Sequence, residues 1–192
     1  GTKVIVVEML PQVLPTEDAE VGRRLETEFK KRKIEVLTGE KVESVTIEGE
    51  GRVKTTLSSG KTYETEKVLV AIGRSLNTQN LGLEELGVET ERGRVLVNHR
   101  METNIKGVYA VGDVTGGIML AHVASKEGIV AAQNCMGKDS TMDYDVVPRC
   151  IYTFPEVACV GLREDEARER GYKIKVSRFP FAASGKALRM GE

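Results

Sequence analysis

The segment Gly107-Val-Tyr-Ala-Val-Gly-Asp113 decides how this chain is interpreted. Its apolar run Val108–Val111 is typical of a buried strand, and Gly112 and Asp113 follow directly. Ligands of α/β sheets bind at the carboxyl ends of the strands, where this pattern puts Asp113. Gly112 allows a ligand to approach the backbone closely, because it has no side chain. We therefore predict that Asp113 accepts a hydrogen bond from a sugar-alcohol hydroxyl; the alternative is a plain strand–turn–helix in which Asp113 is only a cap.

A helix is predicted after this turn, from Leu120 to Cys135, with Gly137 as its stop. The stretch Met119-Leu-Ala-His122 opens it and should present free backbone N–H groups. Those donors and the positive end of the helix suit the negative charge that a reduced flavin gathers at its pyrimidine edge. The sequence from Asp113 to His122 is thus a candidate flavin site.

The first part of the chain is predicted to be strand–helix–strand, part of a βαβ sheet. Val4–Val7 suits a strand buried on both faces, Thr16 should cap the helix, and Ile34–Leu37 is the second strand. Glu8 follows the first strand, where an acidic residue can accept both ribose hydroxyls of an adenosine. It would also repel a 2′-phosphate and so select NAD over NADP. A glutamate in this place is otherwise simply solvated.

The middle of the chain predicts three short antiparallel strands followed by a buried one. Glycine turns, the first at Glu48–Gly51, join the strand-like runs 42–47, 53–57 and 62–65 into a meander. Lys67–Ile72 is a continuous apolar run ended by Gly73, which is typical of a strand buried on both faces. An α/β sheet that carries a β-meander insert is the expected architecture.

The last part of the chain is expected to start with a polar linker, residues 137–145. Residues 146–160 and 172–179 are predicted as strands that flank a helix at 163–170.

The composition argues against several classes of function. The 28 basic and 29 acidic residues nearly cancel, and no basic stripe with aromatics is present, so nucleic acid is not an expected partner. No apolar run approaches the ~18 residues that a membrane span needs. Cys135, Cys150 and Cys159 form no Cys-x-x-Cys pair and are expected to be reduced, buried hydrophobes rather than metal ligands.

Several motifs carry a resemblance to a known family. Residues 103–113 resemble the second FAD motif of the pyridine nucleotide-disulfide oxidoreductases, and Ala71-Ile-Gly-Arg74-Ser-Leu-Asn77 resembles the end of their NAD domain. Within that family, residues 119–122, 152–161 and 179–187 look like the dihydrolipoamide dehydrogenase group. Glutathione reductases typically show Leu-Thr-Pro-Val after the Gly-Asp segment instead.

The resemblance covers the whole chain and implies a three-part α/β fold. Residues 1–73 would be the C-terminal part of a Rossmann-like NAD-binding domain with its β-meander. Residues 74–141 would be the C-terminal part of the FAD-binding domain, and residues 142–192 the start of an α+β interface (dimerisation) domain. Both ends look like cuts through a larger protein, so we expect an internal fragment.

The resemblance also assigns cofactor contacts. Asp113 would hold the flavin ribityl chain, and the backbone of Met119, Leu120, Ala121 and His122 would meet the flavin ring. Glu8 would bind the adenosine ribose of NAD, Val42 would lie against the adenine, and Gly73 would approach the nicotinamide half. His122 is not expected to be a general base, so no catalytic residue and no metal ligand is expected in this chain.

The parent enzyme implied is a flavoprotein that oxidises protein-bound dihydrolipoamide through a redox-active disulfide, FAD and finally NAD⁺. These 192 residues contain no Cys-x-x-x-x-Cys pair, and the His-Glu base belongs to a C-terminal segment, so the chain alone is expected to be inactive. The expected partners are a second subunit and the lipoyl domains of a 2-oxo-acid dehydrogenase or glycine-cleavage complex. The expected location is the cytoplasm, or the mitochondrial matrix in a eukaryote.

Two alternatives stay open on the sequence. The parent could be another member of the family, such as a mercuric, glutathione or coenzyme A-disulfide reductase. The chain could also be a noncatalytic nucleotide-binding or interaction module.

Overall fold

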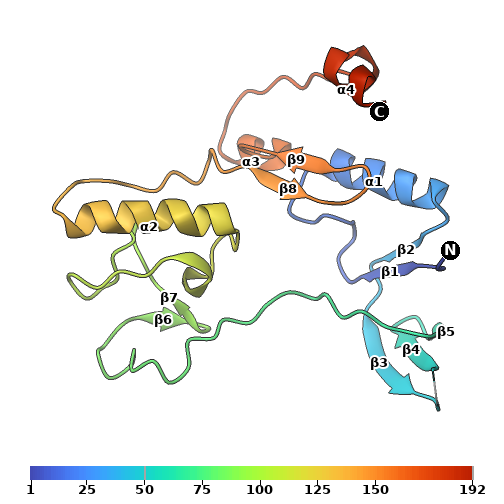
Figure 1. The fold of residues 1–192 in the computed structure, drawn as a ribbon, viewed down its shortest axis with the longest axis horizontal. Helices are drawn as coiled ribbons and strands as arrows, with labels where there is room; N and C mark the ends of the chain where they lie inside the picture. Colours follow the sequence, from blue (N-terminus) through green and yellow to red (C-terminus); the bar gives the residue numbers. More distant parts are fainter. Residues whose placement is uncertain (50, 192) are drawn as a thin grey trace. The chain divides into compact units, whose positions relative to one another are not determined.

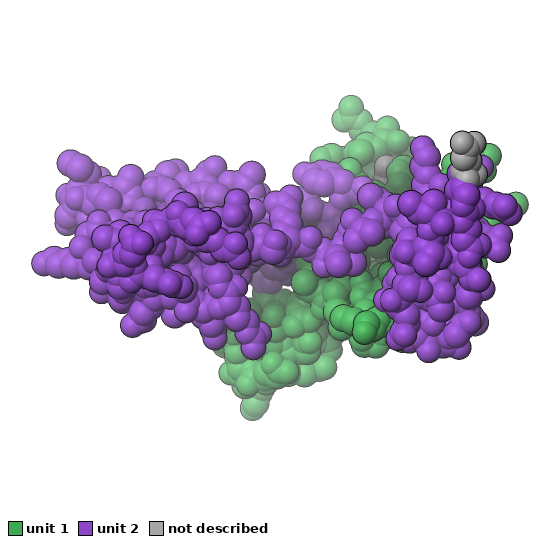
Figure 2. All heavy atoms as spheres, turned by 90° about the horizontal axis from the view of Figure 1, so that it is seen from below, with its two compact units in different colours: residues 1–41, 153–157, 162–192 green, residues 42–152, 158–161 purple. Residues whose placement is uncertain are grey.

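A computed structural model describes residues 1–49 and 51–191 as a mixed α/β structure with several short sheets, which confirms the predicted class (Figure 1). Glu50, in the predicted turn at Glu48–Gly51, lies outside the described residues. The chain divides into two compact units, which are described separately (Figure 2). No helix among the described residues is long and apolar enough to cross a membrane.

Unit 1 comprises residues 1–41, 153–157 and 162–192 and begins with the predicted strand–helix–strand. Strands β1 (Ile5–Glu8) and β2 (Glu35–Thr38) are parallel, and α1 (Ala19–Lys31) connects them. The predicted burial of the first strand on both faces is wrong: the four residues of β1 are all half-buried. Within the described chain β1 pairs with β2 alone, and a two-stranded sheet cannot cover both of its faces.

The start of α1 differs from the predicted cap. Asp18, not Thr16, is the N-cap residue, because Glu17 N–H donates to Leu14 O (3.0 Å) in a turn that delays the helix. The Asp18 carboxylate instead accepts a hydrogen bond from Glu164 N–H (2.8 Å) at the start of α3 (Glu164–Glu169). The cap therefore joins α1 to a helix far along the chain.

The C-terminal part of unit 1 is helical and irregular. Helix α3 confirms the prediction for residues 163–170, but no strand forms at 172–179, where Phe179 is 75% exposed. A strand needs a neighbour for its backbone groups, and no described strand lies beside this segment. The short helices η2 (Phe181–Ala183) and α4 (Gly185–Met190) were not predicted.

Unit 2 comprises residues 42–152 and 158–161 and starts with the β-meander. Strands β3 (Val42–Ile47), β4 (Val53–Leu57) and β5 (Thr62–Thr65) form an antiparallel sheet in the order β3-β4-β5. These bounds match the prediction, since alternation of residues and glycine turns are local signals.

Two strands predicted as buried are not buried strands in the structure. Residues 67–72 form no strand, and Leu69 and Ile72 are 89% and 94% exposed. Residues 108–111 are half-buried and make a single bridge, Glu102 with Tyr109. Apolar runs of this kind become strands only where neighbouring strands satisfy their backbone groups, which no described strand does here.

The remaining strands are short. Strand β6 (Thr90–Glu91) pairs with β7 (Arg94–Val95) in an antiparallel hairpin. The strand predicted over 146–160 exists only as β8 (Arg149–Ile151) and β9 (Val157–Cys159). Pro155 lies in the gap between them and has no N–H to donate to a ladder.

Helix α2 (Ala121–Cys135) carries the core of unit 2 and confirms the predicted helix. Gly137 follows it with a φ of 77°, as expected for a helix stop. The buried core consists of Met101, Val123, Val130, Ala131, Met142 and Val147. Residues 137–145 are therefore not merely a polar linker, because Met142 is buried and its N–H donates to His99 O (2.8 Å).

Two helical glycines give a matched test of packing. A Cβ added to Gly22 in α1 would lie 2.5 Å from the carbonyl oxygen of Val13, whereas one added to Gly128 in α2 would meet no atom within 4 Å. We expect Gly22→Ala to lower the free energy of unfolding by about 1–3 kcal/mol, because backbone must shift. Gly128→Ala should raise it by about 0.5–1 kcal/mol. Urea unfolding followed by circular dichroism measures both, and equal effects would contradict the structure.

Candidate functional site

The Gly112–Asp113 segment forms a tight turn rather than the end of a strand. The 3₁₀ helix η1 (Gly112–Thr115) begins at Gly112 with a φ of 79° and is followed by Gly116 with a φ of 68°. Gly116 N–H donates to Asp113 O (2.9 Å), and the Thr115 hydroxyl donates to Gly112 O (2.9 Å). This compact turn presents Asp113 to solvent, with its side chain 47% exposed.

Close packing requires glycine at position 116, whereas a Cβ on Gly112 would only be in ordinary van der Waals contact. A Cβ on Gly116 would lie 2.8 Å from the Cβ of Arg94, and a Cβ on Gly112 would lie 3.4 Å from the Cβ of Ala124 in α2. Both residues also have the positive φ that glycine adopts without strain. The turn is therefore held against β7 on one side and α2 on the other.

Asp113 forms an ion pair with Arg74. Arg74 Nη1 lies 3.2 Å from Asp113 Oδ2, and the arginine side chain is 72% exposed. An ion pair this accessible is worth only about 0–1 kcal/mol, because water competes with it. The Asp113 carboxylate can therefore exchange Arg74 for another partner at little cost.

The start of α2 offers hydrogen-bond donors, but not along the whole predicted stretch, because Leu120 N–H donates to Ile118 O (2.9 Å). Leu120 is the N-cap residue in an extended conformation, and among the described residues no side chain caps the helix. The N–H groups of Ala121, His122 and Val123 precede the first intrahelical bond, which runs from Ala124 N–H to Leu120 O (3.0 Å). The first turn holds no acidic residue, so its positive end is not neutralised.

His122 is attached to the backbone rather than set up as a base. Its ring is exposed, and Nε2 lies 2.9 Å from the carbonyl oxygen of Pro148. This contact holds the first turn of α2 against the segment before β8. The predicted contact of the His122 backbone with the flavin ring stays a prediction.

A buried carboxylate beneath the turn was missed in the sequence. Glu127 in α2 is 1% exposed, and its Oε2 accepts a hydrogen bond from Gly112 N–H at 2.7 Å. Its Oε1 accepts one from the Tyr144 hydroxyl at 2.6 Å. The available signal was the helical spacing of Val123, Glu127 and Val130, which puts an acid on the apolar face.

The surroundings of Tyr144 keep its phenol neutral. Burial raises the pKa of Tyr144, and the hydrogen bond to Glu127 and the negative charge of that carboxylate raise it further. The phenol therefore remains a donor to Glu127 over the physiological pH range.

Glu8, the residue assigned to the ribose of NAD, is the last residue of the first strand. It ends β1 at the carboxyl edge of the parallel pair, and Glu40 N–H donates to Glu8 O (3.2 Å). Glu8 Oε1 accepts a hydrogen bond from Leu10 N–H (2.7 Å). Its Oε2 has no partner within the described residues and can accept a hydroxyl.

The other two residues assigned to NAD belong to unit 2, whereas Glu8 belongs to unit 1. Val42 begins β3 and is 41% exposed. Gly73 has a φ of 113°, and a Cβ there would meet no atom within 4 Å. A shared NAD site of these three residues stays a prediction.

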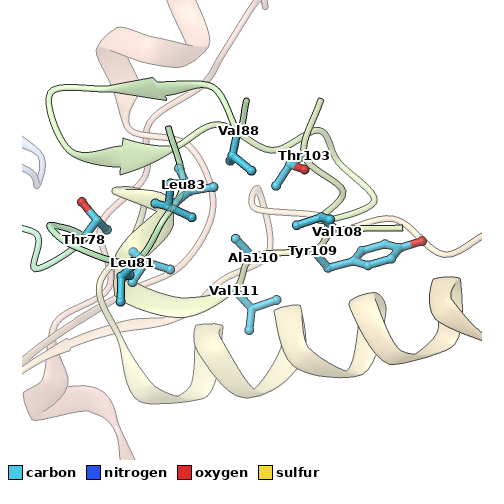
Figure 3. Close-up of a pocket in the computed structure, with 11 residues that line it drawn as sticks. Thr78, Leu81, Leu83, Val88, Thr103, Val108, Tyr109, Ala110 and Val111 are labelled. Carbon is cyan, nitrogen blue, oxygen red and sulfur yellow. The ribbon is translucent and has the colours of Figure 1, made fainter. Parts of the chain in front are cut away.

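An apolar cavity of about 290 Å³ lies in unit 2 beside residues 108–111 (Figure 3). Val111 points towards α2, and Ala110 points to the opposite side. The cavity is lined by Thr78, Leu81, Leu83, Val88, Val95, Thr103, Val108, Tyr109, Ala110, Val111 and Val114. None of these is a carboxylate, histidine, lysine or cysteine, and both threonine hydroxyls already donate to backbone carbonyls. The cavity is thus suited to apolar groups, and Asp113 is not among its lining residues.

The cysteines differ from expectation. Cys135 and Cys150 are exposed and Cys159 is half-buried, so the prediction of buried hydrophobes is wrong for the first two. Cys135 is the last residue of α2, beyond the turns that pack on the core. In the described part of the chain no three His, Cys, Asp or Glu side chains come together as a metal site.

Two family models match the chain. One described as pyridine nucleotide-disulphide oxidoreductase matches residues 1–128, and one described as the dimerisation domain of the same family matches residues 147–192.

Curated relatives match along the whole chain. A dihydrolipoyl dehydrogenase of Bacillus subtilis (strain 168) is 43% identical over 202 residues, and one of Thermus scotoductus is 45% identical over 196 residues. Each alignment covers 100% of this chain and 42% of the relative. The chain therefore spans less than half the length of these proteins.

Two solved structures also match along the whole chain. LpdA from Mycobacterium tuberculosis is 31% identical with a TM-score of 0.90, covering 100% of this chain and 42% of that one. The HOCl-induced flavoprotein disulfide reductase RclA from Escherichia coli is 29% identical with a TM-score of 0.86, covering 100% of this chain and 44% of that one.

The Tyr144–Glu127 pair predicts a pH dependence of stability. The pKa of Tyr144 is raised in the folded state, so the stability from its neutral form is complete below the unfolded value of about 10 and is lost as pH rises above it. We expect Tyr144→Phe to flatten the fall of unfolding free energy above about pH 10. Tyr152→Phe, which removes a hydroxyl from a residue that is 86% exposed, is the control and should keep the wild-type slope. Parallel curves for wild type and Tyr144→Phe would refute the role of this pair.

Proposed function

Because the chain belongs to the pyridine nucleotide-disulphide oxidoreductases, we propose that it is part of a dihydrolipoyl dehydrogenase. Such an enzyme oxidises protein-bound dihydrolipoamide to lipoamide and reduces NAD⁺. The supporting observation is the 43% and 45% identity to dihydrolipoyl dehydrogenases along the whole chain, through the turn at Asp113. The proposed contribution of these residues is to seat FAD and NAD, not to perform the thiol chemistry.

The flavin side of the proposal uses unit 2. Asp113 would accept a hydrogen bond from a ribityl hydroxyl, and this role fits its half-exposed carboxylate and weak ion pair with Arg74. The backbone from Met119 to His122 would meet the flavin ring, and the N–H groups of Ala121 and His122 at the start of α2 would face its pyrimidine edge. FAD, when bound, supplies a two-electron carrier between the dithiol–disulfide couple and NAD⁺.

The nucleotide side uses the end of β1 and the start of the meander. Glu8 would accept hydrogen bonds from the adenosine ribose, through the oxygen that has no partner within the described residues. Its negative charge would disfavour the 2′-phosphate of NADP. Val42 would lie against the adenine, and Gly73 would allow close approach of the nicotinamide half.

The domain organisation proposed is 1–73 for the NAD domain, 74–141 for the FAD domain and 142–192 for the interface domain. The match of residues 147–192 to a dimerisation domain supports a homodimer. Lipoyl domains of a 2-oxo-acid dehydrogenase or glycine-cleavage complex would be the substrates. The proposed location is the cytoplasm, or the mitochondrial matrix in a eukaryote.

A second candidate is a disulfide reductase with another substrate. It is favoured by the likeness to RclA, which is called a flavoprotein disulfide reductase. Assays of the complete protein with dihydrolipoamide and with other dithiols and disulfides separate the two. Turnover of dihydrolipoamide with NAD⁺ supports the first proposal, and turnover of another disulfide alone supports the second.

Substitution of Asp113 tests the flavin side. In the complete protein that contains this chain, Asp113→Ala should lower FAD affinity by about tenfold or more, because a hydrogen bond to a charged group is lost. FAD content is measured from the flavin absorbance band after dialysis. Asp139→Ala removes another exposed carboxylate of unit 2 and should leave the FAD content unchanged. Full flavin retention in Asp113→Ala would refute the assigned contact.

Substitution of Glu8 tests nucleotide selection. In the complete protein, Glu8→Gln should raise KM for NAD⁺ by about tenfold. It should also reduce the preference for NAD⁺ over NADP⁺, because the amide no longer repels the 2′-phosphate. Steady-state kinetics with both nucleotides measure the ratio of kcat/KM for NAD⁺ to that for NADP⁺. Glu26→Gln changes an acid elsewhere in unit 1, paired with Lys30, and should leave the ratio unchanged. An unaltered ratio in Glu8→Gln would remove Glu8 from the site.

A further inference from the structure

Glu127 lies at a buried position of α2 where an apolar side chain is normally found. It lies on the core-facing side of α2 between Val123 and Val130, and it is 1% exposed. Burial of a carboxylate costs several kcal/mol unless its oxygens are hydrogen-bonded, and a hydrophobic residue of similar size often stabilises a fold at least as well. Core packing therefore does not explain why an acid is present at this position.

The first hydrogen bond of Glu127 determines the backbone at Gly112. The Gly112 N–H donates to Oε2 at 2.7 Å, a short distance typical of a donor facing a charged acceptor. Glycine can adopt many φ values, so its own chemistry does not select the observed 79°. The hydrogen bond to Glu127 restrains the Gly112 amide in addition to the hydrogen bonds within the turn. Gly112 immediately precedes Asp113, and its conformation sets the direction of the Asp113 side chain.

The second hydrogen bond fixes the carboxylate itself. The Tyr144 hydroxyl donates to Oε1 at 2.6 Å, and Tyr144 packs against the core of unit 2 between the buried residues Met142 and Val147. The Glu127 side chain thus joins η1, α2 and the 142–147 segment through both of its oxygens. A carboxylate held at both oxygens has little freedom to rotate, so it can hold Gly112 in one conformation.

We infer that Glu127 is a positioning residue of the flavin site, which holds Gly112 so that Asp113 is presented to the ribityl chain of FAD. Tyr144 orients the Glu127 carboxylate for this purpose. The inference rests on the proposed function, and it adds two residues that touch neither the cofactor nor the substrate. Their effect on FAD should pass entirely through Asp113.

Two substitutions of Glu127 test whether its hydrogen bonds, rather than its size, support FAD binding. In Glu127→Gln, the amide oxygen can accept from Gly112 N–H while the NH₂ group donates to the Tyr144 oxygen, so both contacts survive. We expect its FAD affinity to stay within about twofold of wild type, since both bonds remain. In Glu127→Leu, the Gly112 N–H loses its acceptor, and FAD affinity should fall about tenfold.

A double-mutant cycle tests whether Glu127 acts through Asp113. The complete protein is prepared as apoenzyme, and FAD affinity is measured by the quenching of flavin fluorescence. Glu127→Leu should weaken FAD binding in the wild-type background but add no further loss in the Asp113→Ala background. An equal loss in both backgrounds would overturn the inference, because Glu127 would then act independently of Asp113.

Val130→Ala is the matched control for general loss of stability. Val130 is 2% exposed and lies on the same face of α2, and its truncation leaves the Gly112 hydrogen bond intact. It should lower Tm while FAD affinity stays near wild type. A loss of FAD affinity as large as that of Glu127→Leu would show a merely structural effect and overturn the inference.

Tyr144→Phe keeps the test decisive if Glu127→Leu does not fold. This substitution removes the hydrogen bond to one carboxylate oxygen of Glu127 but keeps the hydrogen bond to Gly112. FAD affinity should therefore fall about threefold, which lies between the effects of Glu127→Gln and Glu127→Leu. In the Asp113→Ala background, Tyr144→Phe should cause no further loss. Unchanged FAD affinity in Tyr144→Phe would overturn the inference while the proposed function stands. A wild-type complete protein that binds no FAD would overturn both.

Discussion

The hydrogen bond between the Gly112 amide and the buried carboxylate of Glu127 is the interaction on which the proposed flavin site depends. It connects the turn that presents Asp113 to the helix that carries the core, and Tyr144 extends the connection to the 142–147 segment. A buried polar network in which every group is satisfied restricts a structure to one arrangement, whereas a broken one leaves a costly unpaired charge. The geometry of the candidate flavin site therefore follows from a group inside the core.

The two candidate cofactor sites differ in whether their residues belong to one compact unit or to both. Asp113, the turn after it and the start of α2 all belong to unit 2, so packing within that unit is enough to orient them. The residues assigned to NAD are divided between the units: Glu8 belongs to unit 1, and Val42 and Gly73 belong to unit 2. The flavin assignment therefore rests on contacts that are described within one unit, while the NAD assignment rests on the local setting of each residue.

Elements with strong local signals were predicted well. The β-meander and α2 agree with the structure because alternation, helical periodicity and glycine stops act over a few residues. The apolar runs at 67–72 and 108–111 were predicted as buried strands and are not, because such strands depend on neighbours that local sequence does not specify. The cap of α1 is predicted at Thr16 but lies at Asp18, because Thr16 belongs to the turn Leu14–Glu17, in which Pro15 occupies the second position.

The sequence by itself determined the family, the mixed α/β class and the residues to which cofactor contacts are assigned, because those depend on residue types at fixed spacing. Only the tertiary structure decided which other residues contact these site residues and fix their positions. It paired Asp113 with Arg74, and it placed the carboxylate of Glu127 beneath Gly112, fifteen residues away in the chain. Spacing along a helix shows which face a side chain lies on, but the partner it meets is set only when separate segments pack together. The motif at Gly112-Asp113 is therefore local in sequence, and its geometry is a property of the folded core.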